Sequence, residues 1–176
     1  IIFLVWMINA YNFIDGIDGM AATGAIFISG ASALIILLTN GAIEMIVISL
    51  LLMTCVGAFI FFNWPPASVF MGDSGSIFLG YVFGVLILYT IITGTISSWT
   101  WIIIFGYYIS DTSLTLIIRL IIVKKWYLAH RSHAYQNLAR ISNNHLKVTM
   151  GVLIYNLIFL LPLAIMSVKY PNMAII

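Results

Sequence analysis

The chain has 176 residues, of which 63% are hydrophobic and 7% charged, and its mean hydropathy is +1.15. A soluble domain carries roughly 25% charged residues, so this composition excludes a water-soluble protein. The formal net charge of +2 gives no indication of nucleic-acid binding. Cys55 is the one cysteine, so no intramolecular disulfide can form and the redox compartment cannot be inferred.

Apolar runs divide the chain into predicted membrane spans, each of which needs about 20 mostly apolar residues. Residues 1–10 are long enough only for the end of one span. Pro65 and Pro66 end a later run, and Pro162 predicts a kink in the last one. Five whole spans are expected, over residues 21–39, 45–62, 77–92, 99–123 and 148–168.

The chain starts at Ile1, inside an apolar run and without an initiator methionine. It shows no signal-peptide pattern of a charged start followed by a cleavage site. We therefore expect a C-terminal fragment of a longer protein, with a processed N-terminus as the alternative. Residues 1–176 are expected to form a single transmembrane domain.

Positive charges indicate how the chain is oriented in the membrane. Lys124, Lys125, Arg131, Arg140 and Lys147 fall in one polar loop, and the positive-inside rule places that loop in the cytoplasm. Counting the spans backward puts residues 9–19 and 63–76 on the same face. Lys and Arg alone fix this orientation, yet it also brings Asp and His residues together there. The predicted fold is an all-α integral membrane protein, a polytopic transmembrane helix bundle with an active site at the cytoplasmic helix ends.

The first polar segment, residues 12–19, carries Asn12, Asp15 and Asp18 at intervals of three. On a helix these side chains would share a face, although Gly16 and Gly19 disfavour a helix there. Two carboxylates and an amide suit a hard cation such as Mg²⁺. The alternative is an ordinary loop in which Asp and Gly form turns.

The second polar segment, residues 70–76, opens a span with small residues around Asp73. A helix that starts in this way exposes backbone N–H groups, which favour phosphate. Asp73 could hold the metal ion that binds the same phosphate. The alternative is a simple helix cap provided by Ser74 or Ser76.

The third polar segment, residues 130–136, places Arg131 between His130 and His133. These side chains could grip a diphosphate. One alternative is zinc shared by the two histidines, which the lack of a nearby cysteine disfavours. The other is a solvated basic loop that only sets the topology.

Asp111 lies inside the fifth apolar run, where a charge is costly and indicates a function. Residues 99–123 are more than a straight span requires. The run is therefore either tilted or broken near Gly106, so that Asp111 lies at the cytoplasmic boundary.

In this order, the three polar segments resemble the polyprenyl-phosphate N-acetylhexosamine-1-phosphate transferase family, also called glycosyltransferase family four. Residues 12–19 match its Asn-x-x-Asp-Gly-x-Asp-Gly motif and residues 70–76 its Phe-Met-Gly-Asp-x-Gly-Ser motif. Residues 130–136 resemble its histidine motif in the form His-x-Ser-His-x-Tyr-Gln, typical of the branch that initiates O-antigen synthesis. The family's Asp-Asp motif is absent, which we attribute to the missing N-terminal part. We expect this fragment alone to be inactive.

The resemblance implies a Mg²⁺-dependent transferase of the bacterial inner membrane, with Mn²⁺ as the alternative metal. A UDP-N-acetylhexosamine would give its sugar-1-phosphate to undecaprenyl phosphate, and the products would be UMP and a lipid-linked diphosphate sugar. The implied partners are these two substrates and membrane lipids, with no nucleic acid. The rival interpretation is a multi-span transporter with a site for an anionic substrate.

The resemblance also implies roles for the site residues. Asp73 and Asn12 would bind the metal. Asp15 and Asp18 would shape the nucleotide and metal site, and one of them would influence proton transfer from the acceptor. Phe70 could stack on uracil. The expected catalytic residues are Asp15, Asp18, Asp73 and His133, and the expected substrate-binding residues are Phe70, His130, Arg131 and Asp111.

Overall fold

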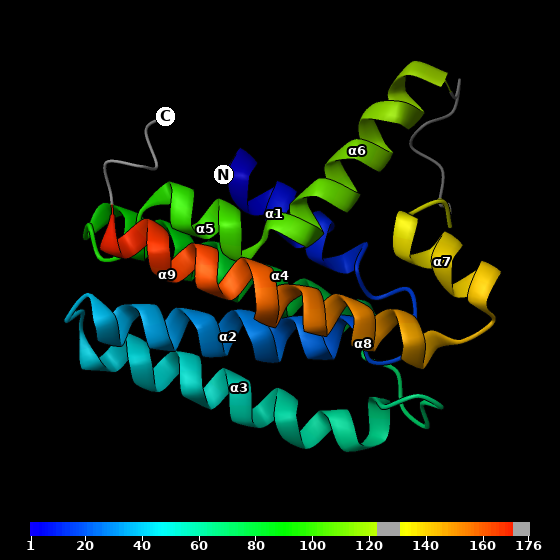
Figure 1. Ribbon diagram of the computed structural model, residues 1–176, viewed down its shortest axis with the longest axis horizontal. Helices are drawn as coiled ribbons and strands as arrows, with labels where there is room; N and C mark the ends of the chain where they lie inside the picture. The colour runs from blue at the N-terminus through cyan, green and yellow to red at the C-terminus, as the bar shows by residue number, and fades with distance from the viewer. Residues whose placement is uncertain (123–130, 171–176) are drawn as a thin grey trace.

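The computed structural model describes residues 1–122 and 131–170, and within them it contains helices and no strand. The helices appear in Figure 1 in chain order along the colour bar. Their bounds are α1 Ile2–Asn12, α2 Met20–Leu38, α3 Ile43–Asn63, α4 Gly72–Ile92, α5 Ser98–Ile104, α6 Gly106–Ile122, α7 Ala134–Ser142, α8 His145–Tyr155, a π-helical turn Asn156–Leu160, and α9 Leu161–Lys169.

Four stretches are long and apolar enough to cross a membrane, and the bent pair α5–α6 is a fifth candidate. They are α2, α3, α4 and the 25-residue stretch His145–Lys169, which joins α8, the π-helical turn and α9. The prediction of a polytopic helix bundle is confirmed. Where a kink was expected at Pro162, a π-helical turn ends at Leu160, two positions before the proline, which has no backbone N–H to donate.

The apolar run of residues 99–123 is broken rather than tilted. α5 and α6 meet at Phe105 with a bend of 80°, and Figure 1 shows α6 turning away from the direction of α5. This confirms the break expected near Gly106. Asp111, one turn into α6, therefore does not lie at the centre of a straight span.

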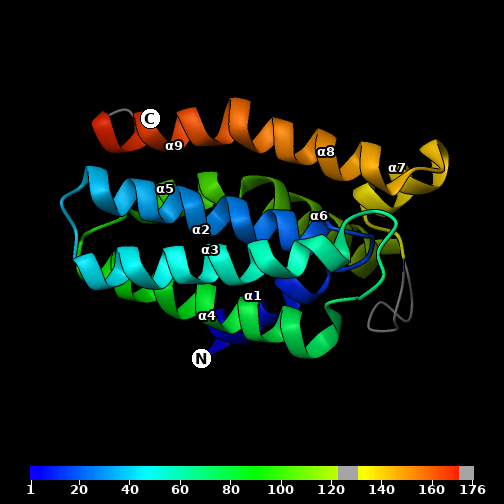
Figure 2. The ribbon, with the colours of Figure 1, turned by 90° about the horizontal axis from the view of Figure 1, so that it is seen from below.

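Two helix pairs form the body of the bundle, α2 against α3 and α1 against α4 (Figures 1 and 2). α2 is buried along most of its length, since its many small residues let neighbouring helices approach closely, whereas α3 is largely exposed. The backbones of α1 and α4 come into contact at Gly80, where a Cβ atom would lie 2.8 Å from the Cα of Ile8. Any larger residue there would push the two helices apart.

The polar connections after α1, after α3 and around α7 lie at the same end of the bundle (Figure 1). Contacts join them directly: Asp18 Oδ2 accepts from the backbone N–H of Ala67 at 3.2 Å, and the Tyr135 hydroxyl donates to the carbonyl of Phe13 at 2.6 Å. The predicted convergence of the three polar segments is confirmed. Lys124, Lys125 and His130 lie outside the described residues.

Candidate active site

The loop that carries Asn12, Asp15 and Asp18 is not helical. α1 ends at Asn12, and turns follow up to Gly19, which adopts a positive φ of 73° before α2 begins. The expectation of a shared helical face is therefore wrong. The turns instead direct Asp15 toward the start of α4 and Asp18 toward α8.

Asn12, Asp15 and Asp73 form an acidic cluster at the first turn of α4. The Asn12 side-chain amide donates to Asp73 Oδ1 at 3.3 Å, and the backbone N–H of Gly72 donates to the Asp15 carboxylate. Burial raises the pKa of Asp15, the Gly72 bond opposes that rise, and the Asp73 charge adds to it. The Asp73 carboxylate therefore lies close enough to disfavour the ionised form of Asp15.

The acidic cluster fits a hard divalent cation. Mg²⁺ typically takes one or two carboxylates and completes its octahedron with waters and substrate phosphates. Asp73, Asp15 and the Asn12 amide supply oxygens of that kind. Within the described residues no group of three or more His, Cys, Asp or Glu side chains is arranged to hold a metal, so the substrate would have to supply some ligands.

The segment around Asp73 forms the first turn of α4, which begins five residues earlier than expected. Ser76 does not cap it, since its hydroxyl donates to the carbonyl of Gly72 at 3.0 Å, and Met71 at the N-cap gives no side-chain bond. Phe70 is 70% exposed just before this turn. Its ring is therefore free to contact a ligand.

His133 is buried against Asp111. Its Nδ1 lies 3.1 Å from Asp111 Oδ2, and the side chains of His133 and Asp111 are only 2% and 6% exposed. Asp111 Oδ1 accepts from the backbone N–H of Ala134 at 2.7 Å. The His133 ring packs between those of Phe13 and Tyr135, with centroids 5.6 and 5.9 Å away. Asp111 thus fastens the start of α7 to α6.

Tyr135 fixes α7 to the loop after α1. Burial raises the pKa of its hydroxyl, which therefore stays protonated and donates to the carbonyl of Phe13. The approach is close because Gly16 has no side chain: a Cβ there would lie 2.3 Å from the Tyr135 hydroxyl. The first and third polar segments are therefore held in contact.

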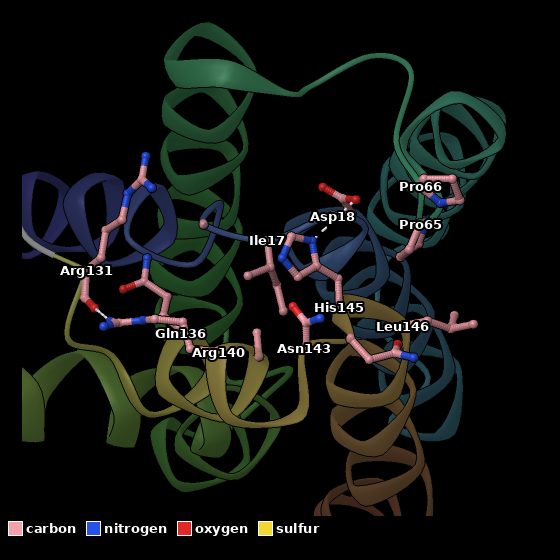
Figure 3. Close-up of a pocket in the computed structure, with 13 residues that line it drawn as sticks. Ile17, Asp18, Pro65, Pro66, Arg131, Gln136, Arg140, Asn143, His145 and Leu146 are labelled. Atoms are coloured by element: carbon pink, nitrogen blue, oxygen red, sulfur yellow. Dashed lines mark hydrogen bonds and ion pairs between the residues drawn. The ribbon is translucent and has the colours of Figure 1, made fainter.

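A cavity of about 820 Å³ opens between the loop after α1, the loop after α3, and helices α7 and α8 (Figure 3). Two predicted site residues line it, Asp18 and Arg131. Arg140, which donates to the carbonyl of Arg131, adds a second guanidinium. Among the residues that the structure describes, the lining is Gly16, Ile17, Asp18, Pro65, Pro66, Arg131, Gln136, Ala139, Arg140, Asn143, Asn144, His145 and Leu146.

His145 and Arg140 are site residues that the sequence analysis missed. His145 opens α8, and its Nδ1 lies 3.3 Å from Asp18 Oδ2. Figure 3 marks this ion pair with a dashed line. Asn144 before it caps the helix by accepting from the backbone N–H of Lys147 at 3.0 Å. An Asn followed by a long apolar run is a helix-start signal, and it could have placed His145 at the polar end of the last span.

Comparison with known proteins bears directly on the acidic cluster. A model of the family described as Glycosyl transferase family 4 matches residues 1–91, which include Asn12, Asp15, Asp18 and Asp73. The chain belongs to this family.

Three similar proteins match the chain over different lengths. A "Probable undecaprenyl-phosphate N-acetylglucosaminyl 1-phosphate transferase" of Bacillus subtilis (strain 168) is 34% identical over 161 residues, 90% of this chain and 44% of the relative. The "Phospho-N-acetylmuramoyl-pentapeptide-transferase" of Chlamydia trachomatis serovar L2 is 44% identical over 79 residues, 43% of this chain and 23% of the relative. The enzyme of the same name from Petrotoga mobilis is 45% identical over 89 residues, which make up 51% of this chain and 26% of the relative. The chain thus spans less than half the length of these relatives.

Proposed function

We propose that the full-length protein transfers an N-acetylhexosamine-1-phosphate from a UDP-sugar to undecaprenyl phosphate. The observation that carries the proposal is the gathering of the acidic cluster and the basic cavity at one end of a membrane helix bundle. A water-soluble nucleotide sugar and a lipid-anchored phosphate can meet only at such a boundary. The Lys and Arg residues of the chain support a cytoplasmic position for this end, and the proposal puts it at the inner face of the bacterial plasma membrane.

The cavity suits the nucleotide sugar. Its volume of about 820 Å³ lies within the range of roughly 300–1,000 Å³ that small-molecule sites occupy. The guanidinium groups of Arg131 and Arg140 at its wall suit phosphate oxygens. Phe70, exposed beside the acidic cluster, offers a face to the uracil base.

The acidic cluster would hold Mg²⁺ through Asp73, Asn12 and Asp15, and the bound ion would neutralise charge on the phosphates. In the reaction, an oxygen of undecaprenyl phosphate bonds to the phosphorus that carries the sugar. The bond from that phosphorus to UMP breaks, and UMP leaves with the electron pair. Asp15, whose pKa is raised by burial, is placed to influence the acceptor's proton.

Two finer features belong to the same proposal. The His-x-Ser-His-x-Tyr-Gln form of the third segment favours an enzyme that initiates O-antigen-like polysaccharides. The donor would be UDP-GlcNAc or a related N-acetylhexosamine. His133, buried beside Asp111, would act on the diphosphate from the start of α7.

The test is an exchange assay on the full-length protein in membranes, with undecaprenyl phosphate and a panel of radiolabelled UDP-N-acetylhexosamines. Label is counted in the lipid extract with Mg²⁺, with Mn²⁺ and with EDTA. Labelled lipid that depends on the metal supports the proposal and identifies the donor. If well-expressed protein gives no labelled lipid with any donor of the panel, the proposal is contradicted.

Transport is the second candidate, because the broken α5–α6 pair is a feature of transporters. Transporter sites lie near mid-membrane, whereas the acidic cluster and the cavity lie at the ends of the helices. Cysteines introduced at Asp15, Asp73 and His133 discriminate the two functions. Labelling from the cytoplasm alone favours the enzyme, and labelling from both sides favours transport.

A further inference from the structure

One oxygen of the Asp18 carboxylate, Oδ2, contacts two protein groups. The His145 ring lies 3.3 Å from Oδ2, and the backbone N–H of Ala67 donates to the same Oδ2 at 3.2 Å. Oδ1 has no hydrogen-bond partner among residues 1–122 and 131–170. Because Asp18 lines the cavity, this second oxygen is available to a bound molecule.

Helix α8 fixes Asp18 from two successive turns. Thr149, four residues after His145, donates its hydroxyl to the carbonyl of Asp18 at 2.9 Å. The backbone N–H of Gly19 donates to the side chain of Asn63 at 3.1 Å, which fixes the residue that follows. The main chain of Asp18 is therefore held without His145. What His145 adds is the orientation of the carboxylate.

His145 also faces the cavity itself. Its side chain is 45% exposed and that of Asp18 is 17% exposed, so the imidazole forms the solvent side of the pair. Figure 3 shows the ring of His145 turned toward Asp18 across the cavity wall. Without that ring, the N–H of Ala67 alone would hold the carboxylate, which could then rotate more easily toward water.

We propose that His145 is a positioning residue for the nucleotide sugar. It holds Asp18 so that Oδ1 faces the cavity and accepts a hydrogen bond from an N–H or O–H group of the substrate. This inference rests on the proposed function for the identity of the substrate. It assigns a role in substrate recognition to the first turn of the last membrane span.

The test measures initial rates of the full-length protein at varied UDP-sugar concentrations. His145→Ala should raise KM on the order of 10-fold, the scale of one hydrogen bond to a charged group, and leave kcat within about twofold. His145→Asn keeps a donor near the position of Nδ1, so its KM should stay within about threefold of wild type. In an Asp18→Asn background, His145→Ala should have no further effect.

The matched control is Lys147→Gln, which removes a basic side chain two residues along the same helix and outside the cavity lining. It should leave KM unchanged. A wild-type KM in His145→Ala overturns the inference. So does a His145→Asn variant as impaired as His145→Ala, or a double variant whose defects multiply.

Failure of the proposed function is a separate outcome. If the wild-type protein gives no labelled lipid with any donor, the role of His145 is decided by calorimetric titration with UDP. Binding that weakens on the order of 10-fold in His145→Ala and recovers in His145→Asn sustains the inference. Equal binding by all variants, or none by the wild type, overturns it.

Discussion

Asp111 and His133, 22 residues apart in the chain, are joined by a contact of 3.1 Å between Oδ2 and Nδ1. The other carboxylate oxygen of Asp111 accepts the first backbone N–H of α7, that of Ala134. The bend between α5 and α6 brings Asp111 to this position. Since both of its oxygens are occupied by protein donors, the geometry favours a supporting role through His133 over the direct substrate contact that we expected for Asp111.

Asp111→Ala tests this support. The substitution leaves the buried His133 ring and the part-buried N–H of Ala134 without their acceptor, at a cost of about 1–3 kcal/mol for the buried group. We expect a lower unfolding temperature in detergent and a transfer rate reduced on the order of 10²-fold. Asp111→Asn, which retains one acceptor oxygen, should lie between this variant and wild type. Ser110→Ala is the control, because among the described residues the Ser110 hydroxyl bonds only to the carbonyl of Tyr107 in its own helix. Wild-type stability and rate in Asp111→Ala would contradict the assignment.

Asp73→Ala should abolish most of the transferase activity. The variant removes a carboxylate from the acidic cluster, and we expect kcat to fall by at least about 10²-fold, the scale of one strong transition-state contact. Glu44→Ala is a matched control, because Glu44 is likewise a first-turn acidic residue, on α3 at the opposite end of the bundle. The measurement is the rate at saturating substrate over a Mg²⁺ titration, with expression checked by immunoblot. Near-normal turnover of Asp73→Ala would remove Asp73 from the metal site.

The raised pKa of Asp15 predicts that the stability of the fold changes with pH. Burial first, and then the Asp73 charge, raise its pKa from an ordinary value of 3.8, against the opposing Gly72 bond. A carboxyl with a raised pKa binds its proton more tightly in the folded state. Its contribution to the free energy of unfolding is therefore complete below pH 3.8 and is lost as the pH rises through the raised pKa.

We therefore expect Asp15→Asn to unfold at a higher temperature than wild type at pH 7 in EDTA. The difference should shrink as the pH falls toward 4, where the wild-type carboxyl regains its proton. Mg²⁺ should stabilise the wild type more than the variant, since the ion offsets the paired carboxylates. Glu44 is exposed and remote from the cluster, so Glu44→Gln should have the unfolding temperature of the wild type at each pH. A wild type more stable than Asp15→Asn in EDTA at pH 7 would contradict the repulsion.

The membrane spans could be predicted from the sequence because the length of an apolar run sets the length of a transmembrane helix. α2 and α3 begin and end within two residues of the expected runs. The start of α4 was missed by five residues because its first turn is polar and lies outside the apolar run. The tilted and broken forms of residues 99–123 could not be separated, since no residue spacing shows the contact between Asp111 on α6 and Ala134 on α7.

Many residues of the site could be predicted from the sequence, but their separation into an acidic cluster and a cavity could not. Three polar segments on one face followed from charge and span counting. The separation of Asp15, in the acidic cluster, from Asp18, in the cavity, depends on turns that no residue spacing reveals. The role of His145 could not be predicted because its partner, Asp18, lies 127 positions earlier in the chain. The two residues meet only because α8 packs against the first loop.

The contact between Gly16 and Tyr135 gives a prediction that separates steric from chemical effects. Gly16→Ala places a methyl group 2.3 Å from the Tyr135 hydroxyl oxygen, which is buried and bonded to Phe13 and cannot easily withdraw. We expect an overpacking cost of about 1–3 kcal/mol and a reduced transfer rate as α7 shifts from the loop.

Tyr135→Phe removes the clashing oxygen and, alone, costs about 1 kcal/mol for the lost hydrogen bond. This oxygen makes one of the two closest contacts of the added methyl group, the other being Gln136 Nε2 at 2.4 Å. The double variant should therefore be more stable than the sum of the single effects predicts. Gly57→Ala is the control, since a Cβ there meets no atom within 4 Å and should not lower the unfolding temperature. Thermal unfolding of all four variants in detergent measures the coupling. Additive losses would show that α7 does not rest on Gly16 through the tyrosine hydroxyl.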